Sequence, residues 1–518
     1  MTSFLTGAPS YCARFGIAVL LVALADFFFY GQPAGITVLL FAILIAAAVV
    51  AVHPAAFSDG RVWLKPAALF VALLPLVENV SVLSFAIALA AMVIFALSLT
   101  GRLRLRPARI AGQVALFLLA APFRLIRDFF RWRQAARHFG RRRIRLAAIA
   151  VWIMPLTLGA VFLALFGAAN PVIDYWFSLI DLMALLDLIQ LLRIAFWLVV
   201  LAGVWAFLRP RLPRFLRRIP RATAPALVGA APETKATPII EDIIFGKAAI
   251  LRALVVFNLL FALQTGLDAT YLWGGVALPD GLTYAAYAHR GAYPLIVTAL
   301  LAAGFVLAAL RPGSATSGDP LIRRLVYVWV AQNIVLVISS ILRLDLYIGI
   351  YALTYWRIAA FVWMGLVAAG LALIIGRIAL RKSNEWLLSA NLLTLSATLY
   401  ACCFINFAAT IANFNVDHSL EMSGTGTPLD TQYLHSLGAV AMPALDRYYT
   451  HKFGLPTTYL ADQVMIDEYI AEQKKWRAWS FRGWRLARVL DNRGPLVLPP
   501  PAQPSQPSQS SQPSVPDR

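Results

Sequence analysis

Several polar side chains that could support chemistry stand near the ends of long apolar runs. Carboxylates that converge on one cleft could act as acid and base on a lipid-linked substrate, and an arginine guanidinium group matches a carboxylate or a phosphate. The candidates for binding a ligand, or for building an ordered cap of loops, are Asp268, Asp280, His289, Arg290, Arg343, Asp345 and Arg357.

No catalytic motif accompanies these candidates. The six histidines form no HExxH motif, and the chain has no GxxxxGK[ST], no GxSxG and no GxGxxG after a strand. The three cysteines have neither the spacing of a metal site nor the number that a disulfide framework needs. Asp417 and His418 near His435 come closest to a polar reaction centre, but such spacing arises by chance in an exposed segment. We expect no catalytic residue, no metal site and no cofactor.

Four arginines stand at the ends of apolar runs that should face away from the cytoplasm, where the orientation rule for membrane proteins disfavours them. They are Arg193, Arg290, Arg343 and Arg357. Each should pair with an acid on the same side, and the candidate acids are Asp187, Asp268, Asp280 and Asp345. Structural pairing is favoured over ligand binding, which would require a guanidinium group that points into a cavity.

Further polar residues lie within the apolar runs, where they are rare and usually face other helices. They are Asp26, Gln264, Gln332, Asn333, Asn391 and Asn406. Hydrogen bonds between helices are the favoured interpretation, and the alternative is that these side chains line a path for a solute.

The elements that must position these residues are membrane-spanning helices. Apolar residues make up 60% of the chain, charged residues only 14%, and the mean hydropathy is +0.73, which is far from a soluble domain. Runs of roughly 20 apolar residues predict about eleven spans. We place them at 14–30, 36–52, 63–76, 80–99, 147–168, 194–208, 249–271, 292–310, 326–341, 358–375 and 387–411.

A block of arginines sets the expected orientation. Residues 101–146 contain thirteen arginines and one acid, Asp128, so this block carries twelve of the twenty net positive charges. Basic residues beside spans stay in the cytoplasm, which places the N-terminus inside and, with eleven spans, the C-terminal tail outside. Arg124, Arg127 and Arg131 recur at helical spacing among aromatic residues, a pattern typical of a helix that contacts anionic lipid headgroups. This membrane context also explains the arginines without nucleic acid.

The composition divides the chain into seven segments. They are a four-span bundle (1–100), the cytoplasmic arginine-rich amphipathic segment (101–146), a two-span unit (147–209), a cytoplasmic linker (210–245), a five-span core (246–411), a helical extramembrane tail (412–493) and a disordered Pro/Ser/Gln tail (494–518). The fold class expected is therefore an all-α transmembrane helix bundle with a small helical extramembrane region.

Three stretches resemble the landmarks of a bacterial multi-pass membrane family that is catalogued only as a domain of unknown function. They are FALQTGLDATYLWGG with GLTYAAYAHRGAYPLI, then LRLDLYIGIYALTYWRIAAFVWMGLV, then NFNVD with LDTQYLHSLGAVAMPAL. The resemblance covers most of residues 239–445, and ADFFFYGQPAG and FGAANPVI near the N-terminus also fit it. It implies a location in the bacterial inner membrane and assigns no activity.

The favoured function is non-enzymatic binding of a ligand or a protein partner, or signalling, through the outer loops and tail, with the arginine-rich face held on anionic lipid. One alternative is a secondary transporter of a small solute, for which Gln332, Asn333, Asn391 and Asn406 would line a path. Another alternative is a membrane-embedded transferase that acts on a lipid-linked substrate through Asp268, Asp280, His289 or Asp345.

Overall fold

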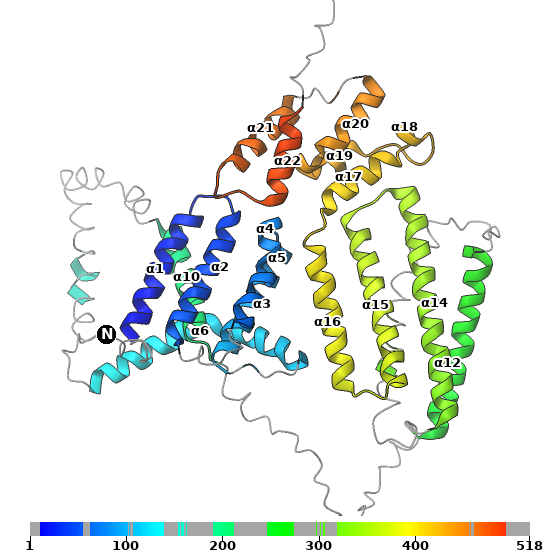
Figure 1. Ribbon diagram of the computed structural model, residues 1–518, viewed down its shortest axis with the longest axis horizontal. Coiled ribbons are helices and arrows are strands. Elements are labelled where there is room, and N and C mark those ends of the chain that lie inside the picture. The colour runs from blue at the N-terminus through cyan, green and yellow to red at the C-terminus, as the bar shows by residue number, and fades with distance from the viewer. Residues whose placement is uncertain are drawn as a thin grey trace, which may run out of the picture. The chain divides into compact units, whose positions relative to one another are not determined.

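A computed structural model describes residues 11–54, 63–101, 103, 107–138, 154–155, 157–159, 162, 190–211, 246–273, 297, 301, 304–305, 319–454, 456 and 460–493. Every regular element in these ranges is a helix, which confirms the all-α class. The chain divides into two compact units (Figure 1). Unit 1 is Met1–Glu233 with Trp476–Ser480, and unit 2 is Thr234–Lys475 with Phe481–Arg518.

Unit 1 packs its helices around one apolar core. Its described helices are α1 (Tyr11–Phe29), α2 (Ile36–Val52), α3 (Leu64–Leu73), α4 (Pro75–Glu78), α5 (Val82–Leu99), α6 (Pro107–His138) and α10 (Leu191–Leu208). On α1 the buried side chains are Ala18, Leu21 and Ala25, which recur at helical spacing, whereas Leu20 is 60% exposed. A helix that stays apolar on its exposed face is typical of a lipid environment.

Helix α6 runs across the direction of α1, α2 and α10 (Figure 1). It packs on the C-terminal end of α10, where Val204 to Leu208 are buried on every side of the helix. The rings of Phe117 and Phe207 lie 5.5 Å apart in this contact. The described part of the arginine-rich segment, Pro107–His138, is therefore one long helix that covers an end of the bundle.

Unit 2 contains a row of long helices in the order α16, α15, α14 and α12 (Figure 1). Their bounds are Asn384–Cys402 for α16, Tyr355–Ala379 for α15, Pro320–Tyr351 for α14 and Lys247–Asp268 for α12, which continues into a π-helical turn at Ala269–Trp273. Asp319 caps α14 by accepting from the backbone N–H groups of Leu321 and Ile322, and its carboxylate lies 2.6 Å from Lys247 Nζ. Helices α12 and α14 therefore begin at the same end of the row.

Short helices at the other end of this row build a second core. They are α17 (Phe407–Asp417), α18 (Leu420–Ser423), α19 (Thr431–Ser436), a 3-10 turn at Gly438–Ala441, α20 (Met442–Phe453), α21 (Leu460–Lys474) and α22 (Phe481–Asp491). Val416, Leu434 and Leu445 are fully buried at its centre. The helices of this core agree with the helical content predicted for residues 412–493, whose location outside the membrane stays a prediction.

Seven helices among the described residues are long and apolar enough to cross a membrane. They are α1, α5, α10, α12, α14, α15 and the Ile110–Asp128 part of α6. Helices α16 and α17 form a bent pair that brings the number to eight, and α2 is apolar but shorter, at 17 residues. Their length and composition fit a polytopic membrane architecture, whereas the predicted total of eleven spans is not confirmed.

Two predicted spans differ from the described helices for local reasons. The run 387–411 is not one straight helix, because α16 and α17 meet at a 69° bend. The run 63–76 is divided into α3 and α4, with Pro75 at the start of the second. The predicted spans 147–168 and 292–310 lie almost wholly outside the described residues, as do most of the linker 210–245 and the tail 494–518.

Candidate functional site

A cavity of about 550 Å³ lies in unit 2 where α14 ends and the short helices begin. Its walls are formed by Ile348 to Thr354 on one side and by parts of the stretch from Phe414 to Tyr433 on the other. Both stretches overlap the segments that carry the family resemblance. The volume falls within the range of roughly 300 to 1,000 Å³ that is typical of small-molecule sites.

Asn415 fixes the turn that forms one wall of the cavity. Its side-chain oxygen accepts from the backbone N–H of Leu353 at 2.7 Å, and its Nδ2 donates to the carbonyl of Leu353 at 3.0 Å. Asn415 is buried, so these two bonds satisfy backbone groups that water does not reach. Ala352, which precedes Leu353 in the chain, has φ +62° and ψ 176°, a conformation that strains any residue with a Cβ.

Arg357 closes the C-terminal end of α14. Its Nη1 donates to the carbonyl of Tyr351 at 2.5 Å and also to the carbonyl of Ala352. The guanidinium group lies 4.8 Å from the ring centroid of Tyr347, whose ring is 4.6 Å from that of Tyr351. These contacts satisfy carbonyl groups that the helix leaves open. Arg357 therefore acts here as a helix cap.

His418 and a glycine-rich turn form the opposite wall. The His418 ring stacks on Phe414 at 4.0 Å between centroids, and its Nδ1 donates to the carbonyl of Phe414 at 2.9 Å. In the neutral ring this leaves Nε2 as an acceptor. Gly426 has φ +97°, and a Cβ there would lie 2.7 Å from the carbonyl oxygen of His418. Only glycine fits this approach.

Glu421 stabilises the same turn from outside the cavity. It accepts from the backbone N–H of Leu429 at 3.1 Å and from the hydroxyl of Tyr448 at 3.2 Å. Burial alone would raise the pKa of Glu421, but these hydrogen bonds and the nearby Lys452 outweigh burial, so the pKa lies below its ordinary value. The turn therefore depends on an ionised Glu421.

The cavity combines aromatic rings and hydroxyl groups with one carboxylate. The rings come from Tyr351, Phe414, His418 and Tyr433, and the carboxylate is that of Asp430. No lysine or arginine is among the residues that line it. Such a site can stack on a ligand and exchange hydrogen bonds with it, and it has nothing to neutralise an anion.

Two of the predicted ligand candidates, Asp268 and Arg343, form a buried ion pair between α12 and α14. Their side chains are 1% and 4% exposed. Gln264, predicted as an intramembrane polar residue, donates from Nε2 to the Asp268 carboxylate at 3.0 Å. This cluster joins two helices, α12 and α14. Asp345, in contrast, is exposed.

Two of the other predicted intramembrane polar residues connect or adjoin the helices of unit 2. Gln332 donates to the carbonyl of Asn258 at 3.3 Å, and Asn258 donates back to the carbonyl of Leu325 at 3.2 Å, so α12 and α14 are bonded in both directions. Asn391 donates to its own helix, and a Cβ on Gly370 of α15 would lie 3.0 Å from its side-chain oxygen. Both observations favour a role of Gln332 and Asn391 in the packing of helices over a role in lining a path for a solute.

The two remaining asparagines of this set act within single helices or at their ends. Asn333 is fully buried and donates to the carbonyl of Trp329 at 2.8 Å in its own helix. Asn406 caps α17 by accepting from the N–H of Ala409 at 3.3 Å, at the bend after α16. It does not lie in the interior of a continuous span as the sequence suggested, because the helix breaks there.

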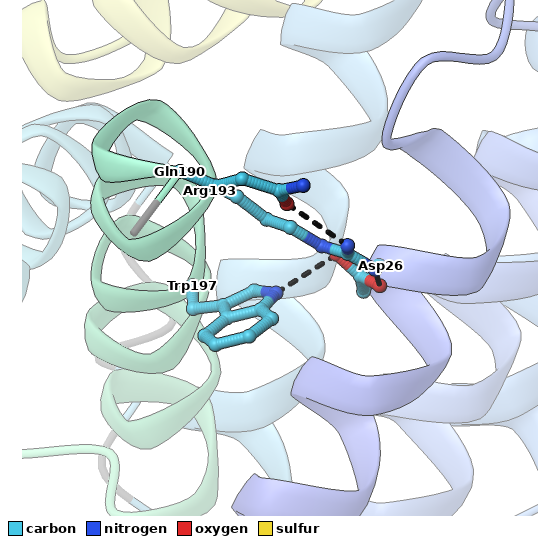
Figure 2. Close-up of polar contacts among 4 residues, drawn as sticks. All are labelled: Asp26, Gln190, Arg193 and Trp197. Carbon is cyan, nitrogen blue, oxygen red and sulfur yellow. Dashed lines mark hydrogen bonds and ion pairs between the residues drawn. The ribbon is translucent and has the colours of Figure 1, made fainter. Parts of the chain in front are cut away.

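Asp26 and Arg193 form a second ion pair, in unit 1. Figure 2 shows Asp26 of α1 facing Gln190, Arg193 and Trp197 at the start of α10. Arg193 donates to both carboxylate oxygens, at 2.8 and 2.5 Å, and Trp197 Nε1 donates to one of them at 2.8 Å. The partner of Arg193 is therefore Asp26, an acid that was not among the four candidates.

The three arginines predicted to contact lipid separate into two environments. Arg124 is 4% exposed, lies 4.1 Å from the ring centroid of Phe117 and donates to the carbonyl of that residue. It is therefore not available to a lipid headgroup. Arg127 and Arg131 are exposed. Asp280, His289 and Arg290 lie outside the described residues, as does Asp187.

Sequence reasoning passed over Asn415 and gave His418 little weight. Within the described residues no group of three or more His, Cys, Asp or Glu side chains could hold a metal ion. The signal that could have pointed to the cavity is that two family-like segments, far apart in the chain, both carry polar and aromatic residues just beyond an apolar run.

Seven of the described helices are long and apolar enough to span a membrane, as in a polytopic membrane protein. Residues 66–448 match the family described as Domain of unknown function (DUF4153), and the chain belongs to this family. No curated protein and no solved structure matches the chain.

Proposed function

We propose that the protein is a ligand-binding protein of the bacterial cytoplasmic membrane, and that the cavity beside Asn415 and His418 is its binding site. The cavity carries the proposal, because it is built from the family-like segments on a rigid turn. Its rings, hydroxyl groups and single carboxylate suit a small neutral or cationic molecule and disfavour an anion.

The distribution of charge supports a location of this cavity on the outer face. In unit 2, Lys247, Arg324 and Arg381 lie at the end of the helix row opposite to the cavity. Basic residues beside spans mark the cytoplasmic side. The cavity would then open outside the cytoplasm, where it could sample external molecules.

Binding is favoured over transport and over catalysis by the polar residues themselves. Gln332 and Asn258 hydrogen-bond between helices, and Asp268 and Arg343 neutralise each other out of solvent. Of the residues named for these two alternatives, Gln332 and Asp268 are therefore engaged in contacts between helices.

Molecules that co-purify with the full chain test the proposal. The protein is solubilised gently, and the small molecules that it retains are identified by mass spectrometry for the wild type, for Asn415→Leu and for Asn413→Leu. Asn413 is a matched control, since it lies on the same helix but is exposed and outside the cavity lining.

We expect a retained molecule without negative charge, present with the wild type and with Asn413→Leu, and reduced at least about tenfold with Asn415→Leu, which corresponds to roughly 1.4 kcal/mol of binding free energy. A set of retained molecules that does not differ between the wild type and Asn415→Leu, or a retained molecule that is an anion, would contradict the proposal.

A further inference from the structure

A cluster of arginines surrounds one buried carboxylate in unit 1. Asp128 of α6 is 4% exposed and lies 3.1 Å from Arg209 and 3.4 Å from Arg211, which follow the C-terminal end of α10. Arg211 also interacts electrostatically with Arg14 of α1 and with two arginines of α6, Arg127 and Arg131. Among the described residues, two guanidinium groups therefore contact Asp128, and three more lie near Arg211.

This cluster carries more positive charge than its own acid can neutralise. Burial lowers the pKa of Arg211, Arg209 lowers it further, and Asp128 acts in the opposite direction. Arg14 has its Nε enclosed without a hydrogen-bond partner. Guanidinium groups held close together repel one another, so a bound anion with several acceptor oxygens would stabilise this arrangement.

An apolar stripe runs along the face of α6 that points away from Asp128. Leu119, Phe123, Ile126 and Phe130 are spaced by four, three and four residues, and they are 71%, 70%, 57% and 58% exposed. At 3.6 residues per turn these side chains share one face. A stripe of this size in contact with water would be unfavourable, and hydrocarbon chains would cover it.

The exposed arginines lie at the border between this stripe and the cluster. Arg127 is one helical turn from Phe123 and from Arg131, and both arginines are exposed. One ligand could therefore contact guanidinium groups and apolar side chains of the same helix at once. That combination of an acidic head and hydrocarbon tails is the chemistry of a phospholipid.

We propose that α6 and the C-terminal end of α10 form a binding site for an anionic phospholipid. Its phosphate lies against Arg127, Arg131 and Arg211, and its acyl chains lie on the apolar stripe. The guanidinium group binds a phosphate through a fork of two N–H donors, and its charge is not lost at any physiological pH. This site is separate from the proposed ligand cavity.

Native mass spectrometry of the delipidated full chain tests the site. The probes are phosphatidylglycerol, phosphatidylcholine with the same acyl chains, and glycerol 3-phosphate as the soluble headgroup. We expect phosphatidylglycerol to bind most tightly. Each basic residue near an anionic lipid contributes about fivefold in affinity, so Arg127→Gln/Arg131→Gln should weaken the binding of phosphatidylglycerol by about 25-fold.

Two further variants separate the contribution of the local arginines from that of net charge, and the contribution of the apolar stripe from that of the headgroup. Arg324→Gln/Lys382→Gln removes the same charge from exposed positions of unit 2 and should leave the affinity unchanged. Phe123→Ser should weaken the binding of the lipid without changing that of glycerol 3-phosphate. Thermal unfolding of each variant without lipid confirms that it is folded.

Three results would overturn the proposal. They are equal affinity for phosphatidylcholine and phosphatidylglycerol, unchanged affinity in Arg127→Gln/Arg131→Gln, and binding of glycerol 3-phosphate as tight as that of the lipid. The last result would identify a site for a soluble anion. None of these outcomes bears on the cavity beside Asn415.

Discussion

The Asp26–Arg193 and Asp268–Arg343 ion pairs differ in how far their side chains are exposed to solvent. Asp26 and Arg193 are 17% and 34% exposed, whereas Asp268 and Arg343 are 1% and 4% exposed. A charge in a medium of low dielectric constant is tolerated only beside its counter-charge. Loss of one partner should therefore matter far more in the α12–α14 pair than in the α1–α10 pair.

Arg343→Met should destabilise unit 2 by about 3 to 5 kcal/mol, because it removes a positive charge that contacts the buried Asp268 carboxylate. The double variant Asp268→Leu/Arg343→Met should recover most of the loss. Thermal unfolding in detergent, followed by tryptophan fluorescence, measures both. Equal stability of the single variant and the wild type would show that the Asp268–Arg343 ion pair does not contribute to the stability of unit 2.

At Ala352, in contrast to Arg343, a substitution should increase the stability of the protein. Its φ of +62° is unfavourable for alanine and accessible to glycine. Ala352→Gly should therefore raise the free energy of unfolding by about 1 kcal/mol after the greater chain entropy of glycine is deducted. Ala352→Val, which adds a branched side chain at the same φ, should lower it. A shift in the same direction for both variants would rule out backbone strain at this turn.

The choice of ion-pair partners shows what sequence alone can predict. Arg343 and Asp268 were both recognisable, since each interrupts the outer end of an apolar run. The partner of Arg193 was not recognisable, because Asp187 is nearer in the chain and the actual partner, Asp26, is 167 residues away. Only the packing of α1 against α10 brings these two residues together.

Among the elements, the segment Trp476–Ser480 is held on the turn between α1 and α2. The N–H of Ile36 donates to the carbonyl of Trp479 at 2.8 Å, and Arg477 lies 4.3 Å from the ring centroid of Phe27. A Cβ on Gly35 would lie 2.3 Å from the carbonyl carbon of Ala478. This contact leaves no space for any side chain at position 35.

Gly35→Ala should therefore displace the segment Trp476–Ser480 from unit 1. Limited proteolysis should then cut the chain after Arg477 at least about tenfold faster, since opening of the contact exposes the backbone. Gly16→Ala is the control, because no atom lies within 4 Å of a Cβ built there. If both variants are cut at the wild-type rate, this segment does not depend on the close approach at Gly35.

The start of α14 should respond to pH through Asp319. Lys247 and the backbone N–H of Leu321 hold the pKa of Asp319 below its ordinary value of 3.8. Ionised Asp319 therefore stabilises the fold above that pH, and the contribution is lost as the pH falls through the lowered value.

The difference in melting temperature between the wild type and Asp319→Asn measures this contribution. It should be present at pH 7 and should shrink below about pH 4, where the carboxylate of the wild type takes up its proton. Asn retains part of the capping ability, so the remaining difference reports on the charge. A difference that is the same at pH 7 and at pH 3 would contradict the pairing with Lys247.

Helix existence was predictable and helix breaks were not. The predicted run 36–52 has the same bounds as helix α2. Gly35 precedes it, and its composition is apolar throughout. The bend after α16 was missed, since the residues Phe404 and Ile405 are as apolar as the span before them. Asn406 caps the next helix, α17, through a local hydrogen bond to Ala409. The direction of α17 follows from its packing into the core of short helices, which depends on residues far along the chain.

At the scale of the whole molecule, the helices of each unit, taken by itself, have basic residues gathered at one end. In unit 1, Arg211 and Arg14 lie at the end that α6 covers, and the α1–α2 turn with Trp476–Ser480 lies at the opposite end of α1. In unit 2, the basic ends of α14 and α15 lie opposite to the cavity. The orientation rule, applied to each unit by itself, predicts that its basic end faces the cytoplasm.

Labelling of single cysteines in intact cells tests this orientation. In a background without Cys12, Cys402 and Cys403, Thr425→Cys at the cavity should react with a membrane-impermeant maleimide from outside, because Thr425 is exposed beyond the outer ends of α14 and α15. Lys382→Cys, between α15 and α16, should react only after the membrane is permeabilised. If Lys382→Cys reacts in intact cells and Thr425→Cys does not, the arginines face outward, and an external ligand could not reach the cavity.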